Sequence, residues 1–108
     1  MIKPPEITDS NLWVSIRRLE IISTIKDVLP AQEKEIVARL RMTLHIMPWL
    51  ARQEIDCLLI EKLIVKKKSV CYSTPRFEFY VKDLSSQIQK YKIRTRREQK
   101  KLGNTIYV

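Results

Sequence analysis

The chain has 108 residues, of which 44% are hydrophobic, and this length suits a single domain with one core. No stretch approaches the ~20 apolar residues that a membrane span needs, and residues 1–10 hold prolines and charges where a secretory signal would be apolar. Two cysteines are too few for a disulfide scaffold. We therefore expect one cytoplasmic domain over residues 1–108, with its core at about 10–82 and a basic helix and tail at 83–108.

The net charge of +9 is unevenly distributed along the chain. Residues 1–62 contain nine Lys/Arg and nine Asp/Glu, whereas residues 63–108 contain twelve Lys/Arg and three acidic residues. A one-sided basic surface attracts polyanions through Coulomb attraction and counterion release. The distribution favours a polyanionic partner; the alternative is a solvated basic tail that serves solubility.

Apolar residues at steps of three and four predict two helices in the first part of the chain. The first covers about residues 10–29 and ends before Pro30, because a proline disfavours the helical conformation of the residue that precedes it. The second begins at once, with Glu33 and Glu35 near its positive end. Its apolar stripe consists of Ile36, Val37, Leu40 and Leu44.

A third helix is predicted from Pro48 to about Lys62, since a proline is tolerated at the first helical position, where the amide would be unpaired. Ile55, Leu58 and Leu59 form its expected buried face. Arg52, Gln53 and Asp56 point the other way.

The pattern changes to strands after residue 63. Residues 64–72 and 77–82 have the composition or the period of two that is typical of strands, and residues 73–76 between them contain Pro75, which favours a turn. These segments predict a β-hairpin.

A last helix is predicted from Leu84 to about Leu102. Its first half carries an apolar stripe that we expect to form a dimer contact, namely Leu84, Ile88 and Tyr91. Its second half is basic and is expected to contact phosphate through Lys90, Arg94, Arg96 and Arg97. Two alternatives remain open, a helix that lies wholly along the phosphate backbone of a polyanion and a disordered arm.

The order helix, helix, helix, hairpin, helix resembles the winged helix-turn-helix family of DNA-binding domains. The best local match is residues 55–64, IDCLLIEKLI, which is similar to the end of the family's recognition helix. Residues 65–81 resemble the wing and residues 35–40 the second helix, so the resemblance covers about residues 16–82. The chain departs from the family at Lys62, where a glycine is usual, and in a segment between the second and third helices, residues 41–49, that looks longer than usual.

This resemblance implies how the domain would contact DNA. The third helix would enter the major groove, with Arg52 and Gln53 at the base edges. The first residues of the wing would contact phosphate, and these are Lys66, Lys67 and Lys68. Arg76 at the wing tip would contact the backbone or the minor groove. The alternatives are that Arg52 and Gln53 only solvate the helix, and that edge lysines prevent strand-to-strand aggregation.

The residue inventory argues against catalysis. His45 is the only histidine, and its apolar surroundings place it at a junction of helices. Gly103 is the only glycine, which excludes a glycine-rich phosphate loop. Cys57, Cys71 and His45 lack the short spacing of a metal site, so we expect no metal, no cofactor and no catalytic residue. Two large aromatic residues are expected in the core or at helix junctions, namely Trp13 and Trp49. The alternative for Trp49, beside Pro48 at a helix start, is stacking on a ligand or base.

The sequence therefore favours a DNA-binding protein that acts as a homodimer. It would be a small transcriptional regulator or an accessory factor of a plasmid or phage. No ligand pocket or sensor domain is visible, so no small-molecule ligand is expected. The alternative is a winged-helix protein-protein interaction module that binds an acidic partner in a larger assembly. RNA ranks third, since no aromatic-rich RNA-binding motif is present.

Overall fold

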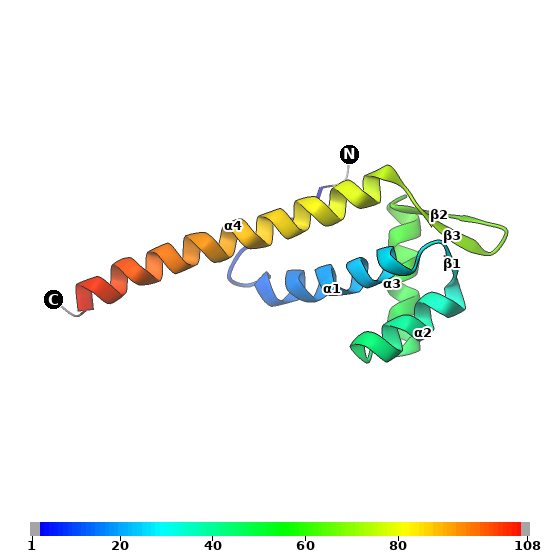
Figure 1. Ribbon diagram of the computed structural model, residues 1–108, viewed down its shortest axis with the longest axis horizontal. Coiled ribbons are helices and arrows are strands. Elements are labelled where there is room, and N and C mark those ends of the chain that lie inside the picture. The colour runs from blue at the N-terminus through cyan, green and yellow to red at the C-terminus, as the bar shows by residue number, and fades with distance from the viewer. Residues whose placement is uncertain (1–2, 107–108) are drawn as a thin grey trace.

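A computed structural model describes the backbone of residues 3–106 and the side chains of residues 3–96. Within this range the chain forms four helices and a small three-stranded sheet (Figure 1). In chain order these elements are α1 (Leu12–Val28), β1 (Ala31–Gln32), α2 (Glu33–Leu44), α3 (Pro48–Ile60), β2 (Ile64–Lys67), β3 (Val70–Ser73) and α4 (Pro75–Ile106).

The first three helices follow the predicted ranges closely. The apolar periodicity predicts that one face of α1 and one face of α2 are buried. The structure confirms this for Ile22, Ile25, Ile36 and Leu40, which are fully buried. The connection between α2 and α3 is short, since α2 continues to Leu44 and only residues 45–47 separate the helices. His45 makes this tight connection by adopting a left-handed conformation with φ of 56°. The expectation of a longer segment is therefore wrong.

The sheet is antiparallel, with the strand order β1-β3-β2. β1 pairs with β3 through Ala31 and Cys71, and β2 pairs with β3 from Ile64 opposite Ser73 to Lys67 opposite Val70. Ile64 and Cys71 point into the core, whereas Val65, Lys66 and Lys67 are exposed. One face of the small sheet therefore covers the helices.

The predicted hairpin is wrong in its position. The turn lies at Lys68 and Ser69, inside the segment predicted as the first strand. These two residues have positive φ angles of 49° and 70°. Two such residues are the geometry of a tight two-residue hairpin. Residues 77–82, predicted as the second strand, instead form the first turns of α4. Pro75 is the first residue of this helix and not the centre of a turn.

The first half of α4 belongs to the core of the chain. Phe77, Tyr80, Leu84 and Ile88 are buried at steps of three and four, and this part of α4 packs along α1. Only 1% of Leu84 and 3% of Ile88 is exposed, while Tyr91 is partly buried against the same core. Leu84 and Ile88 are thus occupied within one chain, which corrects the expectation that this stripe forms a dimer contact.

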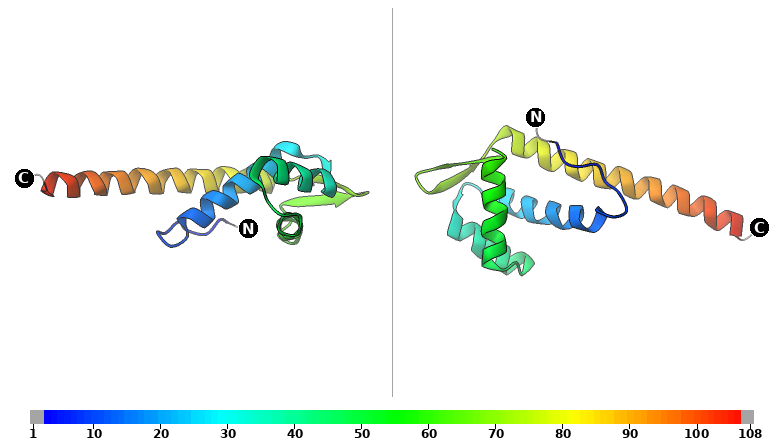
Figure 2. Two further views of the ribbon diagram at one scale, coloured as in Figure 1. Left: turned by 90° about the horizontal axis from the view of Figure 1, so that it is seen from below. Right: turned by 180° about the vertical axis from the view of Figure 1, so that it is seen from behind.

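The helix α4 is longer than predicted, and it continues past the N-terminal end of α1 (Figure 1). The remaining elements gather at its N-terminal end, where α3 stands across the far face of the domain and the β2–β3 hairpin projects beside it (Figure 2). This mostly helical arrangement with a small sheet is compatible with a winged-helix-like layout. Among the residues described, none of the helices combines the length and the apolar character that a membrane span requires.

Lys62 provides a test of local backbone strain. It follows α3 with φ of 60°, a conformation that costs a residue with a Cβ roughly 1–2 kcal/mol and glycine almost nothing. We expect Lys62→Gly to raise the free energy of unfolding by about 0.5–1 kcal/mol, because relief of strain exceeds the added flexibility of the unfolded chain. Urea denaturation measures the change.

The exposed Lys82 in the interior of α4 is the matched control. Lys82→Gly is the same chemical change in a helical conformation, where it should lower stability by about 1 kcal/mol. Equal destabilisation by both variants would show that Lys62 is not strained.

Candidate nucleic-acid interface

The helix α3 has one buried and one exposed face. Ala51, Ile55 and Leu58 are fully buried beneath it. Arg52 and Gln53 are exposed, as the sequence analysis expects. Three further exposed residues accompany them at helical spacing on the outward side, namely Trp49, Asp56 and Ile60. The sequence analysis assigns no function to Asp56 and Ile60, although their spacing of three and seven residues from Gln53 places them on the same face of the helix.

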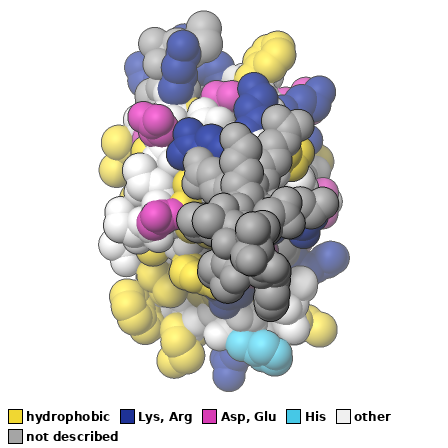
Figure 3. All heavy atoms as spheres, turned by 90° about the vertical axis from the view of Figure 1, so that its left-hand side faces the viewer, with side chains coloured by type: hydrophobic (Ala, Val, Ile, Leu, Met, Phe, Trp, Pro, Cys, Tyr) yellow, Lys and Arg dark blue, Asp and Glu magenta, His cyan; other side chains and the backbone are white. Residues whose placement is uncertain are grey.

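Two tryptophans are exposed, which contradicts the expectation that both lie in the core or at helix junctions. Trp49, in the first turn of α3, is 64% exposed, and Trp13, in the first turn of α1, is 77% exposed. Val14 and Met47 are exposed as well. Hydrophobic side chains can be seen to gather on one side of the molecule in the view along α4 (Figure 3). Exposed apolar surface of this kind marks a site of interaction more often than isolated residues do.

Arg18 fixes the orientation of α3. Its guanidinium lies between two carboxylates of the α3 region, with Nη1 3.6 Å from Glu54 Oε2 and Nη2 3.5 Å from Glu61 Oε2. It also lies 5.7 Å from the centre of the Tyr80 ring in α4. Burial by itself lowers the pKa of Arg18, but Tyr80 and the two carboxylates outweigh this effect and raise the pKa above its usual value. A permanent cation therefore connects α1, α3 and α4.

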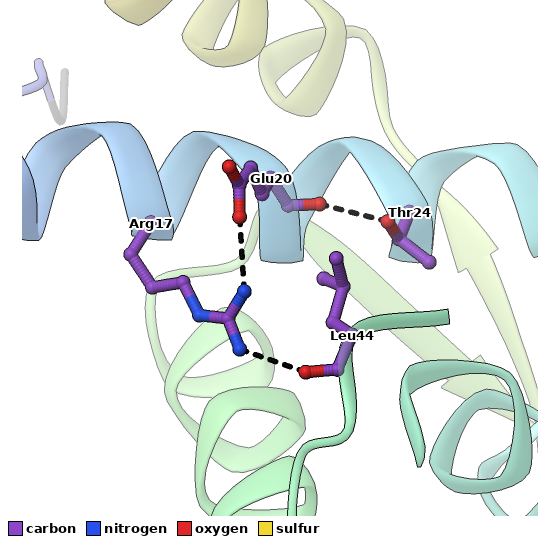
Figure 4. A network of polar contacts seen from close by, with 4 residues as sticks. All are labelled: Arg17, Glu20, Thr24 and Leu44. Atoms are coloured by element: carbon purple, nitrogen blue, oxygen red, sulfur yellow. Dashed lines mark hydrogen bonds and ion pairs between the residues drawn. The ribbon is translucent and has the colours of Figure 1, made fainter. Parts of the chain in front are cut away.

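Arg17 holds the chain just before α3. Its Nη1 donates to Glu20 Oε2 at 2.9 Å, and its Nη2 donates to the backbone oxygen of Leu44 at 2.8 Å (Figure 4). Leu44 ends α2, where backbone oxygens lack a partner within the helix. The same stretch of α1 includes Thr24, whose hydroxyl donates to the backbone oxygen of Glu20. The entrance to α3 is thus attached to α1 by a charged donor.

The lysines of the hairpin differ in whether they form an ion pair within the chain. The Nζ of Lys66 lies 3.5 Å from Glu33 Oε2 in α2, so part of its charge is neutralised within the chain. Lys67 and Lys68 are exposed at the turn, and within residues 3–96 no ion pair involves either of them. The positive charge of the hairpin is therefore concentrated at its tip.

The other predicted basic residues lie on α4. Arg76 is in the first turn of that helix and not at the hairpin tip, so its expected position is wrong. Lys90 and Arg96 are exposed farther along the helix, and the exposed Arg94 places its guanidinium 5.9 Å from the centre of the Tyr91 ring. The side chain of Arg97 lies outside the described residues. The structure therefore separates the predicted site into a hairpin and α3 region at one end and an α4 region toward the other (Figure 1).

The charges of α3 are mixed. Arg52 is its single cation, while Glu54 and Asp56 are acidic, and only Glu54 of these two faces Arg18. An outward Asp56 repels phosphate but accepts a hydrogen bond from the amino group of cytosine. The outward face of α3 is therefore suited to specific contacts and not to a general attraction for polyanions.

The remaining candidate residues form no reactive site. His45 is exposed, and it lies in the short connection between α2 and α3, at the helix junction where the sequence predicted it. Cys71 is buried in the sheet, and burial raises the pKa of its thiol. Cys57 is half-buried on α3. Among the described side chains, no three His, Cys, Asp or Glu residues come together as a metal site would require.

Comparison with protein-family models, curated proteins and solved structures finds no match to this chain. The assignment of a candidate interface therefore rests only on the positions and the chemistry of the residues described above.

Replacing Arg18 tests its role beneath α3. Arg18→Met would leave Glu54 and Glu61 half-buried without their cation, and we expect the free energy of unfolding to fall by about 1–2 kcal/mol. Thermal or urea denaturation measures the loss. Adding Glu54→Gln and Glu61→Gln to Arg18→Met should restore part of it, because the uncompensated charges are then removed. Wild-type stability of Arg18→Met would contradict this role.

Proposed function

We propose that this chain is a winged helix-turn-helix protein that binds duplex DNA, acting as a small transcriptional regulator or as an accessory factor of a plasmid or phage. The observation that carries the proposal is the placement of Lys67 and Lys68. They lie at the tip of a hairpin that directly follows α3, the helix whose outward face carries Arg52 and Gln53. The element order and the sheet order β1-β3-β2 support the same fold.

In this proposal the hairpin and α3 have different tasks. Lys67 and Lys68 contact phosphate, which supplies affinity without sequence preference. Arg52 and Gln53 contact base edges in the major groove, where arginine suits guanine and glutamine suits adenine. Asp56 adds an acceptor for cytosine, and Ile60 adds an apolar contact for a thymine methyl group. Lys66 contributes less than its neighbours because it already pairs with Glu33.

The basic part of α4 forms a second region of phosphate contact. It carries Lys90, Arg94 and Arg96, which follow the buried stripe of α4 along the chain. A homodimer remains part of the proposal, since two copies would place two α3 helices on one duplex. The contact between the two copies must use a surface other than Leu84 and Ile88, which are buried within the chain.

Access to DNA would place the protein in the cytoplasm, and no catalytic function is assigned to it.

A second candidate function is supported by the exposed apolar surface. A cavity of about 400 Å³ lies between α1 and α3, and its lining includes Trp13, Val14 and Ile21. Trp49 and Ile60 add exposed apolar area on α3. Aromatic residues are enriched in protein-protein interfaces. The chain would then be a protein interaction module in a larger assembly, with its basic surface turned toward an acidic partner.

Fluorescence anisotropy with a labelled random-sequence duplex tests the first candidate. If about six phosphates are neutralised, log affinity should fall against log salt with a slope of about −5 between roughly 50 and 200 mM. Absence of binding at the lower salt concentration would reject DNA and favour the protein module.

The hairpin lysines can be tested separately in the same assay. Lys67→Gln with Lys68→Gln should make the slope shallower by about two, because two phosphate contacts are lost. Lys82→Gln removes one equally exposed lysine at the start of α4 and should leave the slope unchanged. If Lys82→Gln makes the slope shallower by half as much as the two-lysine hairpin variant, the net charge alone determines binding and the placement of the hairpin lysines does not matter.

A further inference from the structure

A cavity of about 550 Å³ lies where three segments of the chain meet. Its lining comes from the N-terminal segment, from the connection between α3 and β2, and from the first turns of α4. The N-terminal segment runs alongside α4 and thereby forms one wall (Figure 2). The volume lies within the range of pockets that bind small organic molecules. Neither the candidate interface nor the dimer proposal uses this cavity.

The walls of the cavity are apolar and include aromatic rings. Pro4, Leu63 and Tyr80 are buried and contribute to its lining, together with Pro75. Phe79 also lines the cavity but is 71% exposed. A large aromatic side chain at the edge of an apolar hollow gains contact area when a flat ligand covers it.

The charges of the cavity favour an anion. Lys3, Arg76 and Lys82 line it, and no ion pair within the described part of the chain involves any of the three. Of its two carboxylates, Glu61 pairs with Arg18, a cation that it shares with Glu54. Among the described residues, three lining cations therefore outnumber two lining carboxylates, Glu61 and Asp83, of which Glu61 is paired within the chain.

Hydrogen bonds of Thr74 connect two of the segments that line the cavity. The Thr74 hydroxyl donates to the backbone oxygen of Leu63 at 2.6 Å, and the Thr74 amide donates to the same oxygen at 3.3 Å. The hydroxyl also accepts from the Phe77 amide at 3.3 Å. Leu63 and Pro75, which flank the hairpin, are thereby kept together on the cavity wall.

We propose that this cavity is a binding site for a small organic anion with a flat apolar body, such as an aromatic carboxylate. The rings of Phe79 and Tyr80 contact the apolar body, and the cations Arg76, Lys82 and Lys3 attract the carboxylate. A bound ligand would lie against the base of the β2–β3 hairpin. The proposal is independent of the identity of the macromolecular partner.

Amide NMR of the full chain with 2-naphthoate as the probe tests this site. We expect saturable shifts at Leu63, Phe79 and Tyr80, with a dissociation constant on the order of 1 mM or tighter for a ligand of this size. The uncharged 2-naphthamide has the same body and should bind about five-fold more weakly, because it lacks the attraction to the cations.

Matched variants separate the cavity from the rest of α4. Arg76→Gln with Lys82→Gln should weaken 2-naphthoate binding about five-fold and leave 2-naphthamide unaffected. Lys92→Gln, an exposed lysine of the same helix outside the cavity lining, should change neither. Phe79→Ala should weaken both ligands, and its exposure means that the fold is retained.

Three results would overturn the proposal. The first is the absence of shifts for both ligands at millimolar concentration. The second is equal binding of the acid and the amide, which would reject an anion site. The third is shifts spread over Trp13, Trp49 and Met47, which would indicate general adsorption to exposed apolar surface.

Discussion

The packing of the first half of α4 along α1 is the constraint on which the other features depend. Phe77, Leu84 and Ile88 remove apolar surface from water together, and each such side chain contributes about 1.5–3 kcal/mol when it is fully buried. Because Phe77 lies in this helix, residues 77–82 do not form the second strand of the hairpin, and the hairpin closes at Lys68 and Ser69. The same packing leaves Phe79 on the outer side of α4, where it lines the larger cavity.

The presentation of α3 follows from two arginines of α1. Arg17 holds the end of α2, and Arg18 holds the flank of α3 through Glu54 and Glu61. The Arg17 contact is exposed and the Arg18 contacts are half-buried, and none of them involves the outward residues of α3. The fold therefore does not depend on these outward residues. That freedom allows Trp49 and Ile60 to be exposed on a helix whose opposite side is fully buried. Exposed apolar residues on a rigid helix are suited to a partner surface, whether base edges or another protein.

The basic charge is divided between regions that act separately. The hairpin tip carries Lys67 and Lys68, and the basic stretch of α4 extends toward the other end of the molecule. At physiological salt, exposed charges are screened within about 8 Å. Each region therefore attracts a polyanion on its own, and simultaneous contact requires a partner that is long or bent. Duplex DNA satisfies this requirement, as does an extended acidic protein surface.

The sequence by itself determined those features that depend only on residues close together in the chain. Pro30 and Pro48 mark the boundaries of α1 and α3 because a proline restricts the backbone wherever it occurs, and the excess of basic residues after position 63 is independent of any fold. Residues 77–82 satisfy two periods at once, since Phe77, Phe79 and Val81 alternate while Phe77, Tyr80 and Leu84 follow a helix. Only packing against α1 decides between these periods. The pairing of Arg18 and the cavity beside Phe79 join segments far apart in the chain, so they arise only in the tertiary structure.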